Sequence, residues 1–313
     1  MRYARATQVD EPLRKAIETW RKDGLVRRLW QRDATVWSGA DEAKWLGWLT
    51  ITGEQLTQAV RFAHFAEEVK AAGFTHGVLL GMGGSSLCPE VFRLSFGKIA
   101  GFPDFQILDS TDPARVATIE TGIDMARTLF IVASKSGSTL EPNVFHKYFF
   151  ERSGRNGKQF VAITDPGSNM EKTAQEQGFW RIFHGLPSIG GRFSALSDFG
   201  MIPASAMGID AARLLTGGEA MAQACHLPVR ENPGALLGLL LGALSEEGRD
   251  KITVIASHQI FDLGAWMEQL IAESTGKNGK ALIPVDREPL AAPLMYGSDR
   301  VFVYVRLDSQ ADP

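Results

Sequence analysis

The pattern of hydrophobic and polar positions changes near residue 75. Before this point charged residues are interleaved with Leu and Trp, which indicates a helical segment. After it, short apolar runs are separated by longer amphipathic segments, and this alternation of strands and helices predicts a parallel sheet. The predicted strands cover residues 77–81, 105–110, 128–134, 159–165 and 180–185.

A second unit with the same pattern begins near residue 231. Its predicted elements are a buried helix at 235–244, a strand at 251–257, a helix at 261–274 and strands at 281–285 and 300–307. The predicted fold class is therefore α/β with doubly wound parallel sheets. Because such sheets usually have more than three strands, we expect the second sheet to be incomplete and the chain to be a piece of a longer protein.

These patterns predict three successive segments. The first is a helical arm over residues 1–74. The second is a subdomain over residues 75–230 that carries a phosphate-binding loop. The third is the start of a second subdomain over residues 231–313.

Composition and charge exclude several classes of partner. The chain has 313 residues, 44% of them hydrophobic, and a formal net charge of -3, so it has no long-range positive field for nucleic acid or anionic membranes. Cys88 and Cys225 lack the spacing of a zinc site or a disulfide scaffold. The apolar run at 235–244 is too short to span a bilayer, and the first residues lack the apolar core of a signal peptide. We expect a cytoplasmic protein that binds neither nucleic acid nor membrane.

Hydroxyl side chains cluster in the connection between the predicted strand at 128–134 and the helix that follows it. Ser134, Lys135, Ser136, Ser138 and Thr139 follow one another closely there. Ligands of open α/β sheets bind at this edge, and a helix start offers unpaired N–H groups and positive partial charge to a phosphate. The alternative is a capped turn with solvated serines.

The helix after this loop is predicted to begin near Ser138. Ser138 and Glu141 match a capping box, in which each side chain accepts a backbone hydrogen bond from the other end of the first turn. Pro142 also fits a first helical turn. A helix N-terminus is therefore expected directly after the hydroxyl-rich loop.

A glycine-rich turn, GMGGSSLCPE, follows the first predicted strand. A dinucleotide fingerprint GxGxxG would need glycine at position 86, where Ser86 stands, and no Walker A motif is present. Gly83, Gly84 and Ser85 can instead line a small-ligand pocket with their backbone N–H groups. Taken alone, this turn is a weak signal.

Two further segments contain candidate catalytic side chains. In SIGGRFSALSDFG, two glycines precede Arg192, which can bring permanent positive charge to a developing oxyanion, although an ordinary surface arginine fits as well. In WMEQLIAESTGK, Gln269 and Glu273 are four residues apart on one helix face. The negative end of the helix dipole raises the basicity of a carboxylate, as a general base needs. The residues alone favour a solvated glutamate at this position.

Four segments in this order, GMGGSSLCPE, SKSGSTLEP, GGRFSALSDFG and AESTGKNGKALIPV, resemble the phosphoglucose isomerase family. The resemblance runs from about residue 25 to the end. With LWQRDATVW and WLGWL, it is greatest to the isomerase half of bifunctional transaldolase/glucose-6-phosphate isomerase proteins. It implies two sugar isomerase (SIS) subdomains of flavodoxin-like or Rossmann-like type, the second incomplete here.

The resemblance also implies a function and a site. The activity is an aldose–ketose isomerase that interconverts glucose 6-phosphate and fructose 6-phosphate through a cis-enediol(ate). No metal or organic cofactor is implied, the partner is a small sugar phosphate, and the full-length form is expected to be a homodimer. The implied site consists of Glu273 as base and Arg192 as stabiliser of the intermediate, with Gly84, Ser85, Ser134, Lys135, Ser136, Thr139 and Gln269 binding the substrate.

Some alternatives stay open. The family also uses a histidine and a lysine in ring opening, and neither has a counterpart here, so both are expected beyond residue 313. A transaldolase domain before residue 1 is neither indicated nor excluded. SIS domains also serve as non-catalytic sugar-phosphate-binding regulatory modules, which is the main alternative function. A dinucleotide-binding protein is a weaker one, because Ser86 replaces the required glycine.

Overall fold

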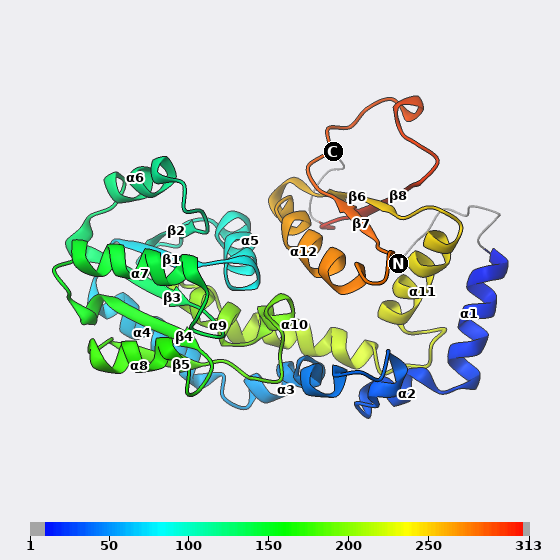
Figure 1. Cartoon of the computed structure of the whole chain (residues 1–313), viewed down its shortest axis with the longest axis horizontal. Coiled ribbons are helices and arrows are strands. Elements are labelled where there is room, and N and C mark those ends of the chain that lie inside the picture. Colours follow the sequence, from blue (N-terminus) through cyan, green and yellow to red (C-terminus); the bar gives the residue numbers. More distant parts are fainter. Residues whose placement is uncertain (1–9, 309–313) are drawn as a thin grey trace. The chain divides into compact units, whose positions relative to one another are not determined.

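The computed structural model describes residues 10–308, which divide into two units, residues 50–216 and residues 10–49 together with 217–308 (Figure 1). The first nine residues of the expected arm and the last five of the expected second subdomain lie outside the described residues. Helices do follow one another up to residue 72, as expected of the arm. However, α3 and α4 belong to the first of these units and α1 and α2 to the other. The three segments as domain boundaries stay a prediction.

Residues 50–216 alternate strands and helices. Their elements are α3 (Ile51–Leu56), α4 (Val60–Ala72), β1 (His76–Gly81), α5 (Leu87–Phe96), β2 (Asp104–Leu108), α6 (Pro113–Thr121), β3 (Thr128–Ala133), α7 (Leu140–Arg152), β4 (Phe160–Thr164), α8 (Asn169–Glu176), β5 (Arg181–His184) and α9 (Asp198–Ala206). The helix α10 (Ala211–Ala224) continues across the boundary at residue 216.

The five strands of this unit form one sheet in the order β2-β1-β3-β4-β5, and every neighbouring pair is parallel. All five strands predicted from the apolar runs are present, and the predicted α/β class with a parallel sheet is confirmed. The chain reverses its direction of winding between β1 and β3. This strand order is that of doubly wound flavodoxin-like sheets, which bind ligands at the point of reversal.

Helices cover both faces of this sheet (Figure 1). On one face Leu79 and Ile131 pack in a cluster with Phe62 and Phe65 of α4 and with apolar residues of α9. On the other face, alternate strand residues such as Phe130 pack with α6, α7 and α8. Because both faces are covered, the strands are continuous apolar runs rather than alternating ones, as parallel sheets require.

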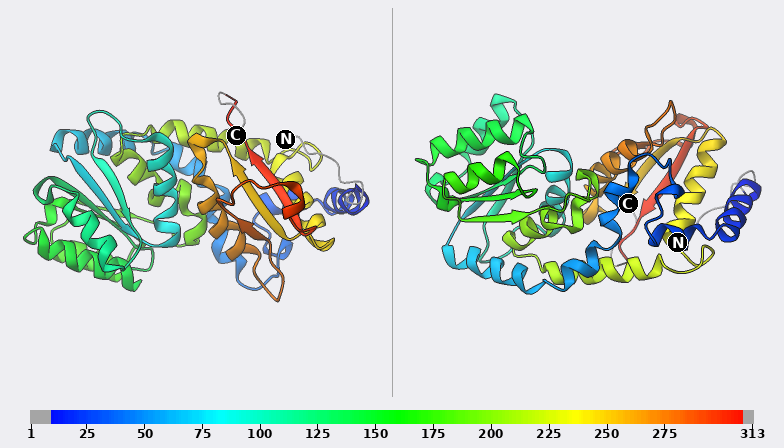
Figure 2. Two further views of the ribbon diagram at one scale, coloured as in Figure 1. Left: turned by 90° about the horizontal axis from the view of Figure 1, so that it is seen from above. Right: turned by 60° about the horizontal axis from the view of Figure 1, so that its bottom comes forward.

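The second unit contains a smaller sheet. Its elements are α1 (Asp10–Lys22), α2 (Leu25–Trp30), α11 (Pro233–Glu246), β6 (Lys251–Ala256), α12 (Leu263–Thr275), β7 (Ile283–Val285) and β8 (Arg300–Val305). The strands pair in parallel in the order β7-β6-β8, with β8 drawn in red in Figure 2. All three strands predicted for this unit are present. Leu13 of α1 packs with Ala243 and Leu244 of α11 in its core.

The helix α11 is less buried than its sequence predicts. Of its residues only Ala243 and Leu244 are buried, whereas Leu237 is 36% exposed. The expectation of a buried helix is therefore wrong for most of its length. The reason is that, among the described residues, the apolar cluster around it consists of a few side chains of α1, α11 and β8. No helix in residues 10–308 is long and apolar enough to cross a membrane.

Candidate active site

Two loops leave the five-stranded sheet side by side at its point of reversal. Gly81 at the end of β1 pairs with Ala133 at the end of β3, so the segments 82–86 and 134–139 begin at neighbouring positions. The carboxyl ends of parallel strands lie at the same edge of a sheet, and ligands of such sheets bind there. The glycine-rich turn and the hydroxyl-rich loop expected from the sequence therefore share one edge.

The hydroxyl-rich loop presents both buried and exposed side chains. Ser134 is 2% exposed, and its Oγ has no hydrogen-bond partner among the described residues. Ser136 and Ser138 are exposed, their hydroxyl oxygens are 2.9 Å apart, and the backbone N–H of Ser138 donates to Ser136 Oγ at 3.2 Å. A buried unpaired hydroxyl is costly, about 1–3 kcal/mol, so Ser134 Oγ is suited to meet a polar ligand.

The start of α7 differs from the expected capping box. The N-cap is Thr139, and no side chain accepts a hydrogen bond there as a cap in the described structure. The predicted box of Ser138 and Glu141 is wrong, because the Ser138 side chain pairs with Ser136 instead. The N–H groups of the first turn are therefore left to an anion or to solvent.

Glycine and asparagine hold this loop in shape. Gly137 has φ +67°, and a Cβ there would lie 2.7 Å from the backbone nitrogen of Met170 at the start of α8. Asn143 donates from Nδ2 to the carbonyl oxygens of Gly137 at 3.1 Å and Thr139 at 2.7 Å. Both the left-handed backbone and the close approach require glycine at 137.

The side chain of Lys135 contacts residues that follow the neighbouring strands β4 and β5. Its ammonium group forms an ion pair with Asp165, which follows β4, and donates to the carbonyl oxygen of Leu186, beyond β5, at 3.2 Å. The side chain thereby ties the loop to two neighbouring strand ends. Its expected contact with a phosphate stays a prediction, and a bound phosphate would share this ammonium with Asp165.

The glycine-rich turn packs directly against the segment that carries Arg192. Gly83 has φ +53°, and a Cβ on Gly84 would overlap the carbonyl of Gly191. Ser194 donates from Oγ to the carbonyl oxygens of Gly191 at 2.6 Å and of Gly84 at 3.3 Å. The structure thus brings Gly84, its neighbour Ser85 (8% exposed) and the turn of Arg192 together.

Arg192 itself is half-buried in the 3₁₀ turn η6 (Gly191–Leu196). Its guanidinium carbon lies 4.9 Å from the centre of the Phe193 ring, a cation–π geometry that restrains the side chain. Arginine keeps its charge at all physiological pH values. The turn therefore places a permanent cation next to the glycine-rich loop.

Gln269 and Glu273 lie in the other unit, on α12. Glu273 is exposed in the last helical turn, and Lys277 donates from Nζ to its backbone oxygen at 2.9 Å. Gln269 is half-buried, and its Oε1 is buried without a hydrogen-bond partner in the part of the chain that the structure describes. Glu273 therefore lies at the negative end of the α12 dipole, and its role as general base stays a prediction.

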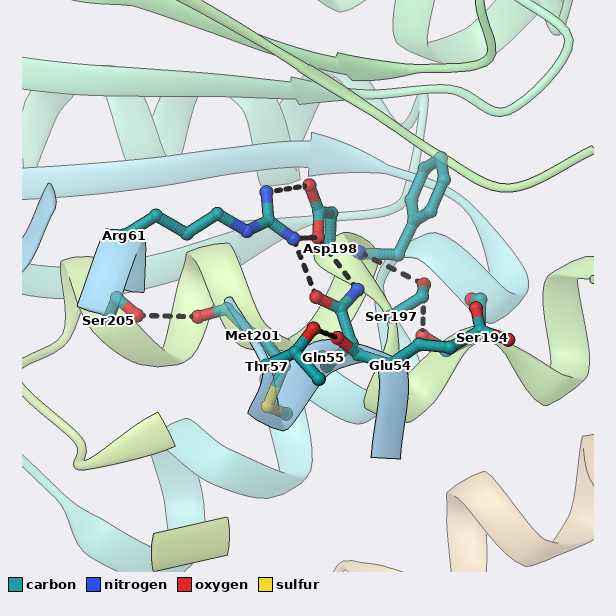
Figure 3. Close-up of polar contacts among 10 residues, drawn as sticks. Glu54, Gln55, Thr57, Arg61, Ser194, Ser197, Asp198, Met201 and Ser205 are labelled. Atoms are coloured by element: carbon teal, nitrogen blue, oxygen red, sulfur yellow. Dashed lines mark hydrogen bonds and ion pairs between the residues drawn. The ribbon is translucent and has the colours of Figure 1, made fainter. Parts of the chain in front are cut away.

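One polar network was missed in the sequence analysis. Arg61 of α4 and Gln55 of α3 both bind the carboxylate of Asp198, the first residue of α9 (Figure 3). Arg61 and Asp198 are 137 positions apart, so no local pattern links them. The only available signal was an acidic residue inside the segment GGRFSALSDFG, six positions after Arg192.

Among residues 10–308, no group of three or more His, Cys, Asp or Glu side chains is arranged to hold a metal ion. The candidate site instead consists of hydroxyls, glycine backbone, a helix start and arginine. A doubly wound parallel sheet with these loops at its reversal point forms an α/β domain whose ligand-binding edge presents groups suited to an anion.

Comparison with known proteins identifies the family. A model of the family described as phosphoglucose isomerase matches residues 52–298. The chain is 35% identical over 219 residues to the glucose-6-phosphate isomerase of Trichormus variabilis, and 35% identical over 213 residues to that of Citrifermentans bemidjiense. The chain belongs to the phosphoglucose isomerase family.

The relatives are longer than this chain. The match to the Trichormus protein covers 66% of this chain and 41% of that protein, and the match to the Citrifermentans protein covers 65% and 40%. The chain therefore spans about two fifths of the length of the curated relatives that it matches.

Solved structures share the fold. The glucose-6-phosphate isomerase of Chlamydia trachomatis superimposes with a TM-score of 0.67 and 28% identity, covering 83% of this chain and 52% of that one. A hypothetical protein from Thermus thermophilus superimposes with a TM-score of 0.74 over 96% of this chain and 68% of that one, at 24% identity. The second likeness concerns the fold alone.

Proposed function

We propose that the protein is an aldose–ketose isomerase that interconverts glucose 6-phosphate and fructose 6-phosphate. Membership of the phosphoglucose isomerase family supports the reaction class. The observation that carries the proposal is the loop at 134–139, where a buried unpaired serine hydroxyl lies just before an uncapped helix start at the reversal point of the sheet. This combination fits a phosphate monoester.

In this proposal the phosphate of the sugar is bound by the hydroxyls of Ser134, Ser136 and Thr139. The N–H groups at the start of α7 add hydrogen bonds and the positive end of a 13-residue helix. Ser134 Oγ gains the partner that it lacks among the described residues. Lys135 acts mainly by holding the loop through Asp165.

The remaining residues act on the carbon chain. Gly84 and Ser85 line the sugar, and Gln269 contacts it. Glu273 removes the proton from C2 of the open-chain aldose, and the same proton or one from solvent is delivered to C1, while the hydroxyl proton moves from O2 to O1. Arg192 stabilises the negative charge on the enediolate oxygen. The reaction is redox-neutral overall, so it needs no redox cofactor, and in this proposal Glu273 and Arg192 carry the proton transfer and the charge stabilisation.

Two further parts of the proposal concern the setting of the enzyme. We place it in the cytoplasm, where the isolated Cys88 and Cys225 stay reduced. A homodimer is proposed for the full-length form, as the resemblance to the family implies. Light scattering of the purified protein tests the second point.

The first test is the formation of glucose 6-phosphate from fructose 6-phosphate, followed by coupled oxidation of the product. We expect turnover and, in D₂O, deuterium at C2 of the product, because an enediol route exchanges protons with solvent. Glu273→Gln should abolish turnover. The matched control is Glu268→Gln, the same change at another position of α12, which should retain it.

A parallel titration with fructose 6-phosphate separates the alternatives. Binding without turnover would mean that the phosphate loop is assigned correctly and that the chain is either a fragment without the ring-opening residues or a non-catalytic module. If the chain shows no binding and no turnover, the assignment of the loop at 134–139 is contradicted. Turnover that survives Glu273→Gln would contradict the role given to this carboxylate.

A further inference from the structure

A buried ion pair lies at the start of the helix that follows the Arg192 turn. Asp198 is 2% exposed, and its Oδ2 accepts from Arg61 Nη1 at 2.7 Å, while its Oδ1 accepts from Arg61 Nη2 and from Gln55 Nε2, the latter at 3.0 Å. Arg61 Nη2 also donates to Gln55 Oε1 at 2.6 Å. Figure 3 shows the guanidinium of Arg61 lying against the Asp198 carboxylate, with Gln55 closing the network.

The position of Asp198 suits a negative charge. It is the first residue of α9, where the helix N-terminus stabilises carboxylates. The Arg61 side chain keeps 32% of its surface exposed, so water solvates part of the cation. Buried ion pairs of this kind add little stability relative to apolar packing, but their geometry is strict. The bidentate contact therefore fixes where α9 begins relative to α4.

A short series of hydrogen bonds connects Asp198 to the turn of Arg192. Ser197, the N-cap of α9, donates from Oγ to the carbonyl oxygen of Ser194 at 2.7 Å. Ser194 in turn donates from Oγ to the carbonyl oxygens of Gly191 at 2.6 Å and Gly84 at 3.3 Å. These hydrogen bonds connect the start of α9 to the residue before Arg192 and to the glycine-rich turn.

We propose that Asp198, held by Arg61 and Gln55, is a positioning residue that aligns Arg192 with the enediolate. The inference rests on the proposed function, because it concerns the same site. The ion pair does not include the loop at 134–139, because that loop follows β3 whereas Asp198 comes after β5. Removing the ion pair should therefore weaken stabilisation of the charged intermediate much more than recognition of the sugar phosphate.

The test compares two ligands by calorimetry. Fructose 6-phosphate reports recognition of the phosphate and the neutral sugar. The probe 5-phospho-D-arabinonate has the same phosphate and a carboxylate that carries charge where the enediolate would, so it reports the alignment of Arg192. The measured quantity is the ratio of the two dissociation constants. A change that only lowers the folded fraction affects both constants equally and leaves their ratio unchanged.

The main variant is Asp198→Asn, which keeps the size of the side chain and removes its charge. We expect the arabinonate to bind at least about tenfold more weakly, equivalent to about 1.4 kcal/mol, with the constant for fructose 6-phosphate changed less than about threefold. An unchanged ratio would overturn the inference while leaving the proposed function intact. Failure of the unaltered chain to bind either ligand would instead overturn the proposed function.

A second variant keeps the inference testable if Asp198→Asn does not fold. Arg61→Lys retains the positive charge but loses the planar fork that bridges both carboxylate oxygens. Like Asp198→Asn, it should weaken binding of the arabinonate relative to fructose 6-phosphate, here by about threefold. An unchanged ratio of the two dissociation constants would overturn the inference. The matched control is Glu68→Gln, which breaks the ion pair of α4 with Arg181 of β5 and should leave the ratio as it is.

Discussion

The two parallel sheets are built from similar apolar strands but are buried to different degrees. Every residue of β3 is buried. In β8 none of the six residues is buried, and Phe302 and Tyr304 are 48% and 41% exposed. The two strands differ in their neighbours. The strand β3 lies between β1 and β4, in a sheet with helices packed on both faces. The strand β8 lies at the edge of its sheet and pairs only with β6 among the described residues. An apolar run predicts a strand, but its burial depends on what packs against it.

The largest contrast is expected from adding a methyl group to a helical glycine. A Cβ on Gly200 in α9 would overlap the carbonyl oxygen of Ala195, so Gly200→Ala should lower the free energy of unfolding by about 3 kcal/mol. On α11, Gly238 has nothing within 4 Å of such a Cβ, and Gly238→Ala should stabilise by about 0.5–1 kcal/mol. Denaturant unfolding of both variants tests this contrast, and equal effects would contradict it.

Truncation of a valine side chain should give a smaller difference in stability between the two sheets. Val132 in β3 is fully buried, and Val132→Ala should cost about 2 kcal/mol through lost burial and the cavity left behind. Val303 is the half-buried counterpart in β8, and Val303→Ala should cost less than about 1 kcal/mol. Amide hydrogen exchange in peptides from each strand measures the two effects separately. A larger effect at Val303 would mean that β8 is better covered than the described contacts show.

The smallest effects are expected at the surface, where the two units should not differ. Hydrogen bonds from Thr35 and the Arg28 guanidinium lower the pKa of Asp33 from 3.8 to about 2. In the other unit, a backbone hydrogen bond from Gly167 and the His184 ring lower the pKa of Glu171. Because both pKa values are depressed, each ionised group stabilises the fold above its ordinary pKa, and the contribution disappears as pH falls through the folded value.

Asp33→Asn should therefore remove a small part of the stability lost between about pH 4 and pH 2. Glu171→Gln should remove a small part of the stability lost as the pH falls below 4.5, the ordinary pKa of this carboxyl. Thermal unfolding as a function of pH measures the loss. A variant whose acid sensitivity equals that of the unaltered chain would contradict the corresponding pKa shift.

Much of the fold could be predicted from the sequence because periodicity is local. The eight strands of residues 10–308, the parallel sheets and the two loops at the edge of the first sheet follow from apolar runs and from glycine and hydroxyl residues after them. The ion pair of Lys135 with Asp165 could not be predicted, since it joins the ends of two strands. The same holds for Arg61 and Asp198, which are brought together only when α4 and α9 pack on one face of the sheet.

The cover of the second sheet could not be predicted for a related reason. The apolar sequence of α11 predicts a buried helix, yet burial is a property of its neighbours rather than of its own residues. The capping box at Ser138 and Glu141 failed because a closer partner, Ser136, was available to the serine hydroxyl. Local motifs are thus reliable for the type of element and less so for its contacts.

The central claim is that the unit at residues 50–216 binds the sugar phosphate at the reversal point of its sheet. Hydrogen exchange of the chain with and without fructose 6-phosphate tests this most directly. The account predicts protection in the segments 82–86, 134–139 and 191–194, with smaller changes in β2 and β5. Protection confined to other segments, or none at saturating ligand, would contradict it.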